Sequence, residues 1–145
     1  MYTYCMKIYA VGKNSNIKIE AMNEHLFRMF NLKNNSVIGD MYVSRRNELY
    51  IADLEIEKAQ RRKGYGKLFL DFAKKLSEEW GLGGKLRVLA GTKVTDTQNP
   101  SYVFYRKYGF TSDDKQVLNQ IDDSIKTGNP LNYLKMPPIY MYYHP

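Results

Sequence analysis

The stretch AQRRKGYGKLF, residues 59–69, gathers four cations and two glycines into one turn. It directly follows the alternating run LYIADLEI, residues 49–56, which predicts a β-strand, and it precedes a run whose apolar residues recur at helical spacing. A strand that leads through a glycine-containing turn into a helix points several backbone N–H groups at one spot, with the positive end of the helix dipole behind them. The turn is therefore a candidate anion site. A phosphate cradle, a nucleic-acid patch and a solvated basic bend are the three interpretations to compare.

The spacing of the two glycines excludes two familiar phosphate cradles. A P-loop requires four residues between its glycines and then Gly-Lys-Ser/Thr, but here the second glycine and its lysine are followed by Leu68. The dinucleotide fingerprint G-x-G-x-x-G requires a third glycine where this chain has Phe69. The pattern that remains is R-x-x-G-x-G, from Arg61 to Gly66.

Alternation and helical spacing predict the remaining elements. Predicted strands cover residues 2–11, 37–44, 49–56, 86–92 and 137–145, and a short run at 17–21 fits either a strand or the start of a helix. The runs 37–44 and 49–56 flank a short polar link, which indicates an antiparallel hairpin. Predicted helices cover residues 23–31, with Asn23 as the N-cap, then 68–80, about 100–108, and a segment that ends before Gly128.

The segment NPSYVFYRKYGF, residues 99–110, carries its own start and stop signals. Asn99 is a natural N-cap, Pro100 suits the first helical position, and Gly109 suits a left-handed residue after the helix. Phe110 then provides the apolar contact that closes such an end. A short helix is expected between Asn99 and Gly109.

The order of these elements predicts one mixed α/β domain that spans residues 1–145. Its sheet should contain both antiparallel and parallel pairs, and the strand–helix–strand unit around the basic turn should cross over right-handed. An extra helical segment is expected over about 112–134, before the last strand.

Charge and cysteine content limit the classes of protein to which the chain belongs. The net charge of +7 favours polyanionic partners, which include nucleic acid, anionic membrane and phosphate-rich ligands. Cys5 is the single cysteine, and with two histidines it forms no convincing zinc-ligand set. The N-terminus lacks the features of a signal peptide, and no apolar run approaches the ~18 residues of a membrane span. We therefore expect a cytoplasmic protein without a membrane partner.

The two motifs R-x-x-G-x-G and FYRKYGF, in this order and about forty residues apart, resemble those of the GNAT superfamily, the Gcn5-related N-acetyltransferases. The resemblance spans roughly residues 37–110, and a last strand in the tail is consistent with it. It implies a GNAT-like acyltransferase fold, in which a central twisted sheet of antiparallel and parallel strands carries helices on both faces.

The resemblance also implies acetyl-CoA (coenzyme A) as cosubstrate. In that family the glycine turn wraps the pyrophosphate, and the preceding strand pairs with the pantetheine arm like an added strand. The family often has an asparagine seven positions before its motif tyrosine. Gln98 occupies that place here, with Asn99 one step later. The implied cofactor-binding residues are Leu54, Glu55, Ile56, Arg61, Arg62, Lys63, Gly64, Tyr65, Gly66, Lys67, Gln98 and Asn99.

The chemistry implied by the resemblance is direct transfer of the acetyl group in a ternary complex. The motif tyrosine falls on Tyr105, and a phenol with a pKa of about 10 suits a general acid for the departing thiolate. Asp53 and Glu55 share one face of their strand and are the candidates for the base that deprotonates the acceptor amine. This mechanism requires neither a metal nor a covalent enzyme intermediate.

Two other functions are compatible with parts of this sequence: nucleic-acid binding and acyl-CoA sensing without catalysis. A basic nucleic-acid-binding module would use the cations with interleaved tyrosines, but the narrow glycine spacing and the lack of a familiar RNA-binding signature argue against it. A catalytically idle acyl-CoA sensor would use the same fold. The acceptor amine is unidentified. The net charge disfavours a highly cationic acceptor unless the acidic residues Asp113, Asp114, Asp122 and Asp123 attract it, and a homodimer is left open.

Overall fold

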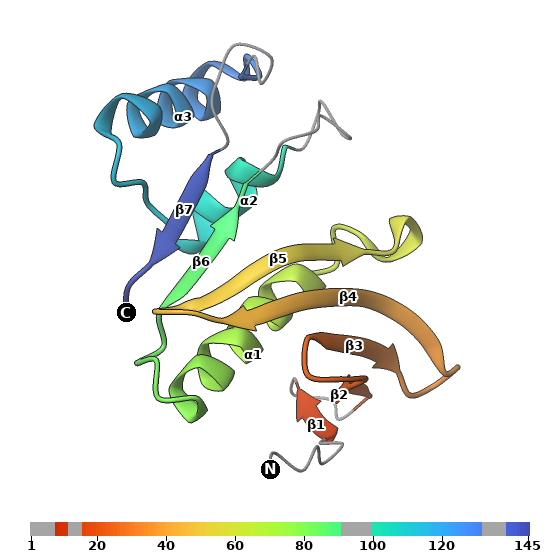
Figure 1. The fold of residues 1–145 in the computed structure, drawn as a ribbon. Helices are drawn as coiled ribbons and strands as arrows, with labels where there is room; N and C mark the ends of the chain where they lie inside the picture. Colours follow the sequence, from red (N-terminus) through yellow and green to blue (C-terminus); the bar gives the residue numbers. More distant parts are fainter. Residues whose placement is uncertain (1–7, 12–15, 91–99, 132–138) are drawn as a thin grey trace.

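The structure is a computed structural model, which describes residues 8–11, 16–90, 100–131 and 139–145. Within these ranges a seven-stranded sheet and three α-helices make up the fold (Figure 1). The strands follow one another across the sheet in chain order. They are β1 (Ile8–Val11), β2 (Ile17–Ala21), β3 (Leu26–Asn31), β4 (Ser36–Arg45), β5 (Leu49–Ile56), β6 (Leu86–Leu89) and β7 (Tyr140–Tyr143). The helices are α1 (Tyr65–Glu79), α2 (Ser101–Tyr108) and α3 (Lys115–Thr127).

The sheet mixes two kinds of pairing, as the sequence predicts. Strands β1 to β5 form a continuous antiparallel meander, which includes the expected β4–β5 hairpin. Strand β6 then pairs with β5 in parallel, because α1 returns the chain to the same end of the sheet. Strand β7 pairs with β6 in the antiparallel sense.

The expected helix over residues 23–31 is wrong, because the structure has β3 there. Phe27 and Met29 are buried while their neighbours are partly exposed, which is the period of two of a strand. The Asn23 side chain does accept two backbone N–H bonds, from His25 and Leu26, at 2.8 and 2.9 Å. These bonds form a turn in the loop before β3, where an asparagine competes with helix formation.

One face of the sheet carries the core, and α1 packs on it. Alternate residues of neighbouring strands are fully buried there, such as Met29, Met41 and Val88. Helix α1 contributes Phe72, whose ring centroid lies 5.2 Å from that of Phe27. At the far end of α1 the Trp80 carbonyl accepts a bond of 2.7 Å from the Arg45 guanidinium. Strands β3 and β4 are therefore fixed against α1, which Figure 1 draws behind the strands.

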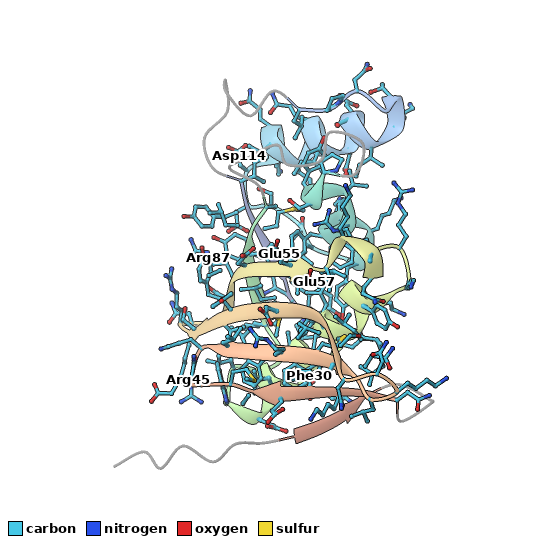
Figure 2. All side chains as sticks on the ribbon, turned by 90° about the vertical axis from the view of Figure 1, so that its right-hand side faces the viewer. Phe30, Arg45, Glu55, Glu57, Arg87 and Asp114 are labelled. Atoms are coloured by element: carbon cyan, nitrogen blue, oxygen red, sulfur yellow. The ribbon has the colours of Figure 1, made fainter. Side chains whose placement is uncertain are left out.

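The opposite face of the sheet is called the outer face here. Strand alternation and cross-strand pairing place polar and aromatic side chains on it. Figure 2 labels two of them, Glu55 and Arg87. The residues of the outer face used below are Arg28, Asp40, Tyr42, Tyr50, Asp53, Glu55, Arg87, Tyr140 and Tyr142.

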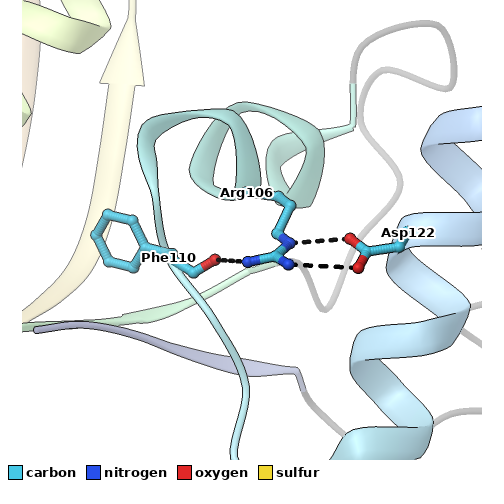
Figure 3. A network of polar contacts seen from close by, with 3 residues as sticks. All are labelled: Arg106, Phe110 and Asp122. Atoms are coloured by element: carbon cyan, nitrogen blue, oxygen red, sulfur yellow. Dashed lines mark hydrogen bonds and ion pairs between the residues drawn. The ribbon is translucent and has the colours of Figure 1, made fainter.

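Helix α2 packs against α1, and α3 packs against α2. The Tyr108 hydroxyl donates a 2.7 Å bond to Asp71 of α1. On the other side, Arg106 forms an ion pair with Asp122 of α3, with 2.9 Å between Nε and Oδ1 (Figure 3). Helix α3 begins at the Asp114 cap, whose side chain accepts two backbone N–H bonds. It lies within the 112–134 segment for which the sequence predicts extra helix.

In the described part of the chain, no helix is both long enough and apolar enough to cross a bilayer.

Candidate functional site

Strands β5 and β6 pair over a short distance and then separate. Their parallel pairing is confined to three residues of β5, and the last pair is Ile51 with Val88. Strand β5 continues for five more residues to Ile56, and along this length it stays paired with β4 on its other edge. Between Ala52 and Ile56, the edge that faces β6 has no strand partner among the described residues. Such an edge offers backbone N–H and C=O groups to an extended ligand.

A β-bulge lies where the two strands begin to separate. Val43 pairs with Ile51 and Tyr42 pairs with Asp53, so Ala52 is an extra residue without a partner on β4. The bulge shifts the alternation by one residue, and as a result both Tyr50 and Asp53 lie on the outer face. Beyond it, Leu54 and Ile56 pack against the core, while Glu55 is exposed on the outer face.

The basic turn leads from the end of β5 into α1 through two residues with positive φ. Arg62 has φ 64° and Gly64 has φ 85°, and Gly64 is the residue that precedes α1. The first bond across the start of the helix is donated by the Leu68 N–H to the Gly64 carbonyl. The N–H groups of the first helical turn have no intrahelical acceptor and point out of the helix end. The turn thus has the backbone form that binds anions.

The two glycines of the motif are needed for different reasons. At Gly64 the left-handed backbone favours glycine, although a Cβ there would have nothing within 4 Å. At Gly66 the backbone is helical, but a Cβ would lie 2.9 Å from Cζ of Phe104 on α2. Gly66 therefore allows α2 to lie close to the start of α1.

The four cations of the turn lie within three residues of Gly64, the N-cap of α1. Arg61 donates from Nε to the Ile56 carbonyl at 2.9 Å, which fixes the turn to the end of β5. Arg62, Lys63 and Lys67 are exposed. No described carboxylate forms an ion pair with any of the four, so their charge is available to an anion at the helix end.

Tyr105 of α2 is buried, and its hydroxyl is held in the protonated form. Burial raises the pKa of Tyr105 far above its usual value, and the negative charge of Asp53 on β5 raises it further. The ring packs between Phe104 and Phe110, with centroids 5.2 Å away on either side. The structure therefore brings Tyr105 and Asp53 into electrostatic contact, although they are far apart in sequence.

Two of the predicted site residues lack a described position, and two residues of the site were not predicted. Gln98 and Asn99 lie outside the described residues. Ala52 is not predicted from the sequence, because a bulge depends on the partner strand and leaves no local signal. Gly39 of β4 is not predicted either; a Cβ there would lie 2.5 Å from the Glu55 carbonyl oxygen. A glycine inside an otherwise apolar strand is the signal that indicates such a close backbone approach.

Metal ligands are not grouped in the described ranges. No cluster of three or more His, Cys, Asp or Glu side chains in residues 8–11, 16–90, 100–131 and 139–145 is arranged to hold a metal ion.

Comparison with protein families identifies one match for most of the chain. A family model described as "Acetyltransferase (GNAT) family" matches residues 8–110. A search of curated proteins finds no match.

Solved structures share the fold at low sequence identity. The PaiA N-acetyltransferase from Thermoplasma acidophilum, in complex with coenzyme A, superposes with a TM-score of 0.54 at 17% identity over 81% of this chain. A Bacillus anthracis protein in complex with acetyl coenzyme A gives a TM-score of 0.54 at 25% identity over 85% of this chain and 64% of its own length. Nourseothricin acetyltransferase gives a TM-score of 0.56 at 18% identity over 94% of this chain and 81% of its own. The chain spans 58% of the length of the Thermoplasma acidophilum protein.

Proposed function

The chain belongs to the acetyltransferase (GNAT) family, and from this we propose that it moves an acetyl group from acetyl-CoA to a primary amine of a small molecule, peptide or protein. We further propose that residues 1–145 act as a single domain in this reaction. The acceptor attacks the thioester directly in a ternary complex.

The donor site is proposed along a line from the basic turn to the unpaired edge of β5. The pyrophosphate would lie at the start of α1, where the left-handed Gly64 leaves open space beside the backbone N–H groups and Arg61 to Lys67 supply positive charge. The pantetheine arm would pair with Leu54 to Ile56 on the unpaired edge. Two of the structural neighbours hold coenzyme A or acetyl coenzyme A, which supports this assignment.

The reaction removes two protons from the acceptor nitrogen, one before and one after it attacks, and supplies one proton to the departing sulfur. Asp53 or Glu55 takes a proton from the acceptor ammonium, and the free amine nitrogen forms a bond to the carbonyl carbon. A backbone N–H of β5 stabilises the oxyanion near the bulge. The carbon–sulfur bond then breaks, and Tyr105 gives its proton to the departing thiolate. The nitrogen of the adduct loses its second proton to solvent, and Tyr105 regains a proton from solvent. The products are the N-acetylated amine, coenzyme A and the one proton that the carboxylate took from the ammonium.

The separation of β5 from β6 beside the start of α1 is the observation that carries the proposal. It combines an unpaired strand edge, an anion-binding helix end and a buried protonated tyrosine within one part of the fold. Neither a nucleic-acid surface nor a solvated bend requires all three.

A calorimetric comparison of Gly64→Asp with Gly64→Asn tests the donor site. Both side chains tolerate the left-handed backbone, so the strain is matched, but only Asp places a negative charge beside the proposed pyrophosphate. We expect Gly64→Asp to weaken acetyl-CoA binding at least about fivefold more than Gly64→Asn, since such a charge at about 4 Å is worth about 1–4 kcal/mol and about 1.4 kcal/mol corresponds to tenfold in affinity. Equal affinities of the two variants, or wild-type protein that binds a short oligonucleotide and no CoA compound, would refute the proposal.

A second measurement separates an enzyme from an idle sensor. Release of free CoA thiol is followed with a panel of amines after binding of acetyl-CoA has been established. Acetyl-CoA binding without thiol release for any amine would identify the sensor.

A further inference from the structure

Two arginines on the outer face lie over tyrosine rings beside the site. The Arg87 guanidinium carbon is 4.4 Å from the ring centroid of Tyr140, 5.5 Å from that of Tyr142 and 5.7 Å from that of Tyr50. The guanidinium of Arg46, in the β4–β5 turn, lies 4.1 Å from the same Tyr50 ring. The name arginine–tyrosine cluster is used below for Arg46, Tyr50, Arg87, Tyr140 and Tyr142.

The positive charge of this cluster is not neutralised by any described carboxylate. Neither arginine forms an ion pair within the described ranges, and the buried Nε of Arg87 has no hydrogen-bond partner. Arg28, elsewhere on the same face, differs in that a carboxylate neutralises its charge, because its guanidinium donates hydrogen bonds of 2.8 and 3.2 Å to Asp40. Stacking on tyrosine holds a guanidinium in one orientation and leaves its charge in place. The cluster is thus an ordered cationic surface whose charge is available to bind an anion.

The cluster lies next to the place where β5 and β6 separate. Arg87 pairs with Tyr50, one residue before the final Ile51–Val88 pair. Its guanidinium lies closest to Tyr140, which pairs with Leu89, two residues further toward the separation. The positive charge is therefore directed toward the unpaired edge, on the same face as Asp53 and Glu55.

We propose that the arginine–tyrosine cluster binds an anionic group of the acceptor, so that the acceptor is an amine that also carries a carboxylate or a phosphate. The inference rests on the proposed acetyltransferase function and names its substrate class. The ammonium lies at Asp53, where it faces the thioester, and the anionic group lies at Arg87. Asp53 lies three residues beyond Tyr50 on β5, which at about 3.3 Å per residue is about 10 Å along the strand. The Arg87 guanidinium lies nearer to Asp53 than this, because it is displaced toward Tyr140. An ω-amino acid with a chain of about six carbons, which extends to less than about 10 Å, fits this shorter separation.

The surroundings favour such a small acceptor over a nucleic acid. A single strand needs a continuous basic groove along its phosphates. Here the two arginines lie beside the first residues of β5, and Asp53 and Glu55 come later on that strand. Both carboxylates are exposed and would repel the next phosphates of a nucleic-acid strand. A face with a cationic and an anionic end instead fits a ligand that carries both charges.

Four acceptors of matched chain length test the inference: 6-aminohexanoate, 6-aminohexyl phosphate, hexylamine and 1,6-diaminohexane. For the wild-type protein we expect kcat/KM to be at least tenfold higher for the two anionic acceptors than for hexylamine, and lowest for the diamine. The two anionic acceptors distinguish a carboxylate from a phosphate.

The variant Arg87→Gln should remove this preference. We expect kcat/KM for the anionic acceptors to fall at least tenfold, while that for hexylamine stays within threefold of the wild-type value. Arg28→Gln is the matched control, because it removes a guanidinium from the same face that Asp40 already neutralises, and it should keep the preference. If Arg87→Gln fails to fold, Arg46→Gln in the exposed turn should give a smaller loss in the same direction.

Several outcomes would overturn the inference. Equal rates for all four acceptors would contradict it while leaving the acetyltransferase function intact, and so would an equal loss for hexylamine in Arg87→Gln. If no amine releases CoA, the proposed function itself fails, and NMR titration with hexanoate then decides about the cluster. Binding of hexanoate that Arg87→Gln abolishes supports an anion site, and its absence refutes one. Oligonucleotide binding with steep salt dependence that Arg87→Gln abolishes would assign the surface to nucleic acid instead.

Discussion

Arg106 holds Asp122 through two hydrogen bonds, from Nε to Oδ1 at 2.9 Å and from Nη2 to Oδ2 at 3.3 Å (Figure 3). Its remaining terminal nitrogen, Nη1, donates to the Phe110 carbonyl at 3.0 Å. Arg106 is the neighbour of Tyr105 on α2, so this guanidinium joins the helix that carries the proposed general acid to the extra helix α3. Helix α3 is thereby linked to the site without contributing a reacting group.

Asp122→Asn should loosen α3 with little effect on global stability. Both partners are partly exposed, with side-chain exposures of 30% and 47%, so the pair contributes less than about 1 kcal/mol to the free energy of unfolding. Hydrogen exchange should nonetheless become faster for the amides of α3, because local opening costs less than global unfolding. Asp123→Asn is the control, since it removes the same charge from the next residue. Equal exchange rates in the two variants would show that the pair does not hold α3.

Tyr105→Phe should reduce turnover and leave donor binding intact. Loss of a positioned proton donor lowers kcat by about 10²- to 10⁴-fold, whereas acetyl-CoA affinity, measured by calorimetry, should change by less than threefold. Tyr102→Phe on the same helix is the control, because that hydroxyl bonds Ser124 at 2.7 Å and serves the packing of α3. Unchanged kcat in Tyr105→Phe at every pH would exclude the general-acid role.

Gly66→Ala should move α2 away from the start of α1. The new methyl would lie 2.9 Å from Cζ of Phe104, which requires α2 or that ring to shift, and such overpacking costs about 1–3 kcal/mol. We expect the variant to lose both stability and turnover, because Tyr105 moves with its helix. Gly128→Ala is the control. Gly128 has positive φ, but no atom lies within 4 Å of the new methyl, so this variant tests the cost of backbone strain without overpacking. An unchanged kcat in Gly66→Ala would show that turnover does not require α2 to lie close to the start of α1.

Stability should fall as the pH rises above about 10, the usual pKa of tyrosine. Burial raises the pKa of both Tyr105 and Tyr108, and a hydrogen bond to Asp71 raises that of Tyr108 further. Below pH 10 both the folded and the unfolded chain keep these protons, so neither tyrosine makes the free energy of unfolding depend on pH. Above pH 10 the unfolded chain releases them while the folded chain retains them, and unfolding becomes more favourable. Denaturant titrations between pH 8 and 11 measure the decline, which Tyr108→Phe should make shallower; an identical slope in that variant would contradict the assignment.

The sequence predicts those parts of the protein whose determinants are local. The turn from Arg61 to Gly66 combines glycine conformation with a helix start, and both are encoded in adjacent residues. The Gly109 end of α2 is equally local, and the Phe110 N–H indeed bonds the Tyr105 carbonyl at 3.0 Å.

Other parts depend on residues far away in the chain. The run from Leu26 to Asn31 has apolar residues that fit both a helix and a strand, and only pairing with β2 and β4 decides for the strand. The bulge at Ala52 exists because β4 has one residue fewer over the same length. The electrostatic interaction between Asp53 and Tyr105 likewise requires the tertiary fold, and so does the stacking of Arg87 on Tyr140.

The unpaired stretch of β5 has a consequence for solubility. Exposed backbone donors and acceptors in an extended strand are a template for pairing with another chain, and thus for edge-to-edge aggregation. Asp53 and Glu55 place charges along this stretch, which opposes such association. Because a bound ligand would occupy the same backbone groups, we expect light scattering on warming to begin at a higher temperature with coenzyme A present than without it. The strand that accepts the donor would then also be the one that the donor shields from self-association.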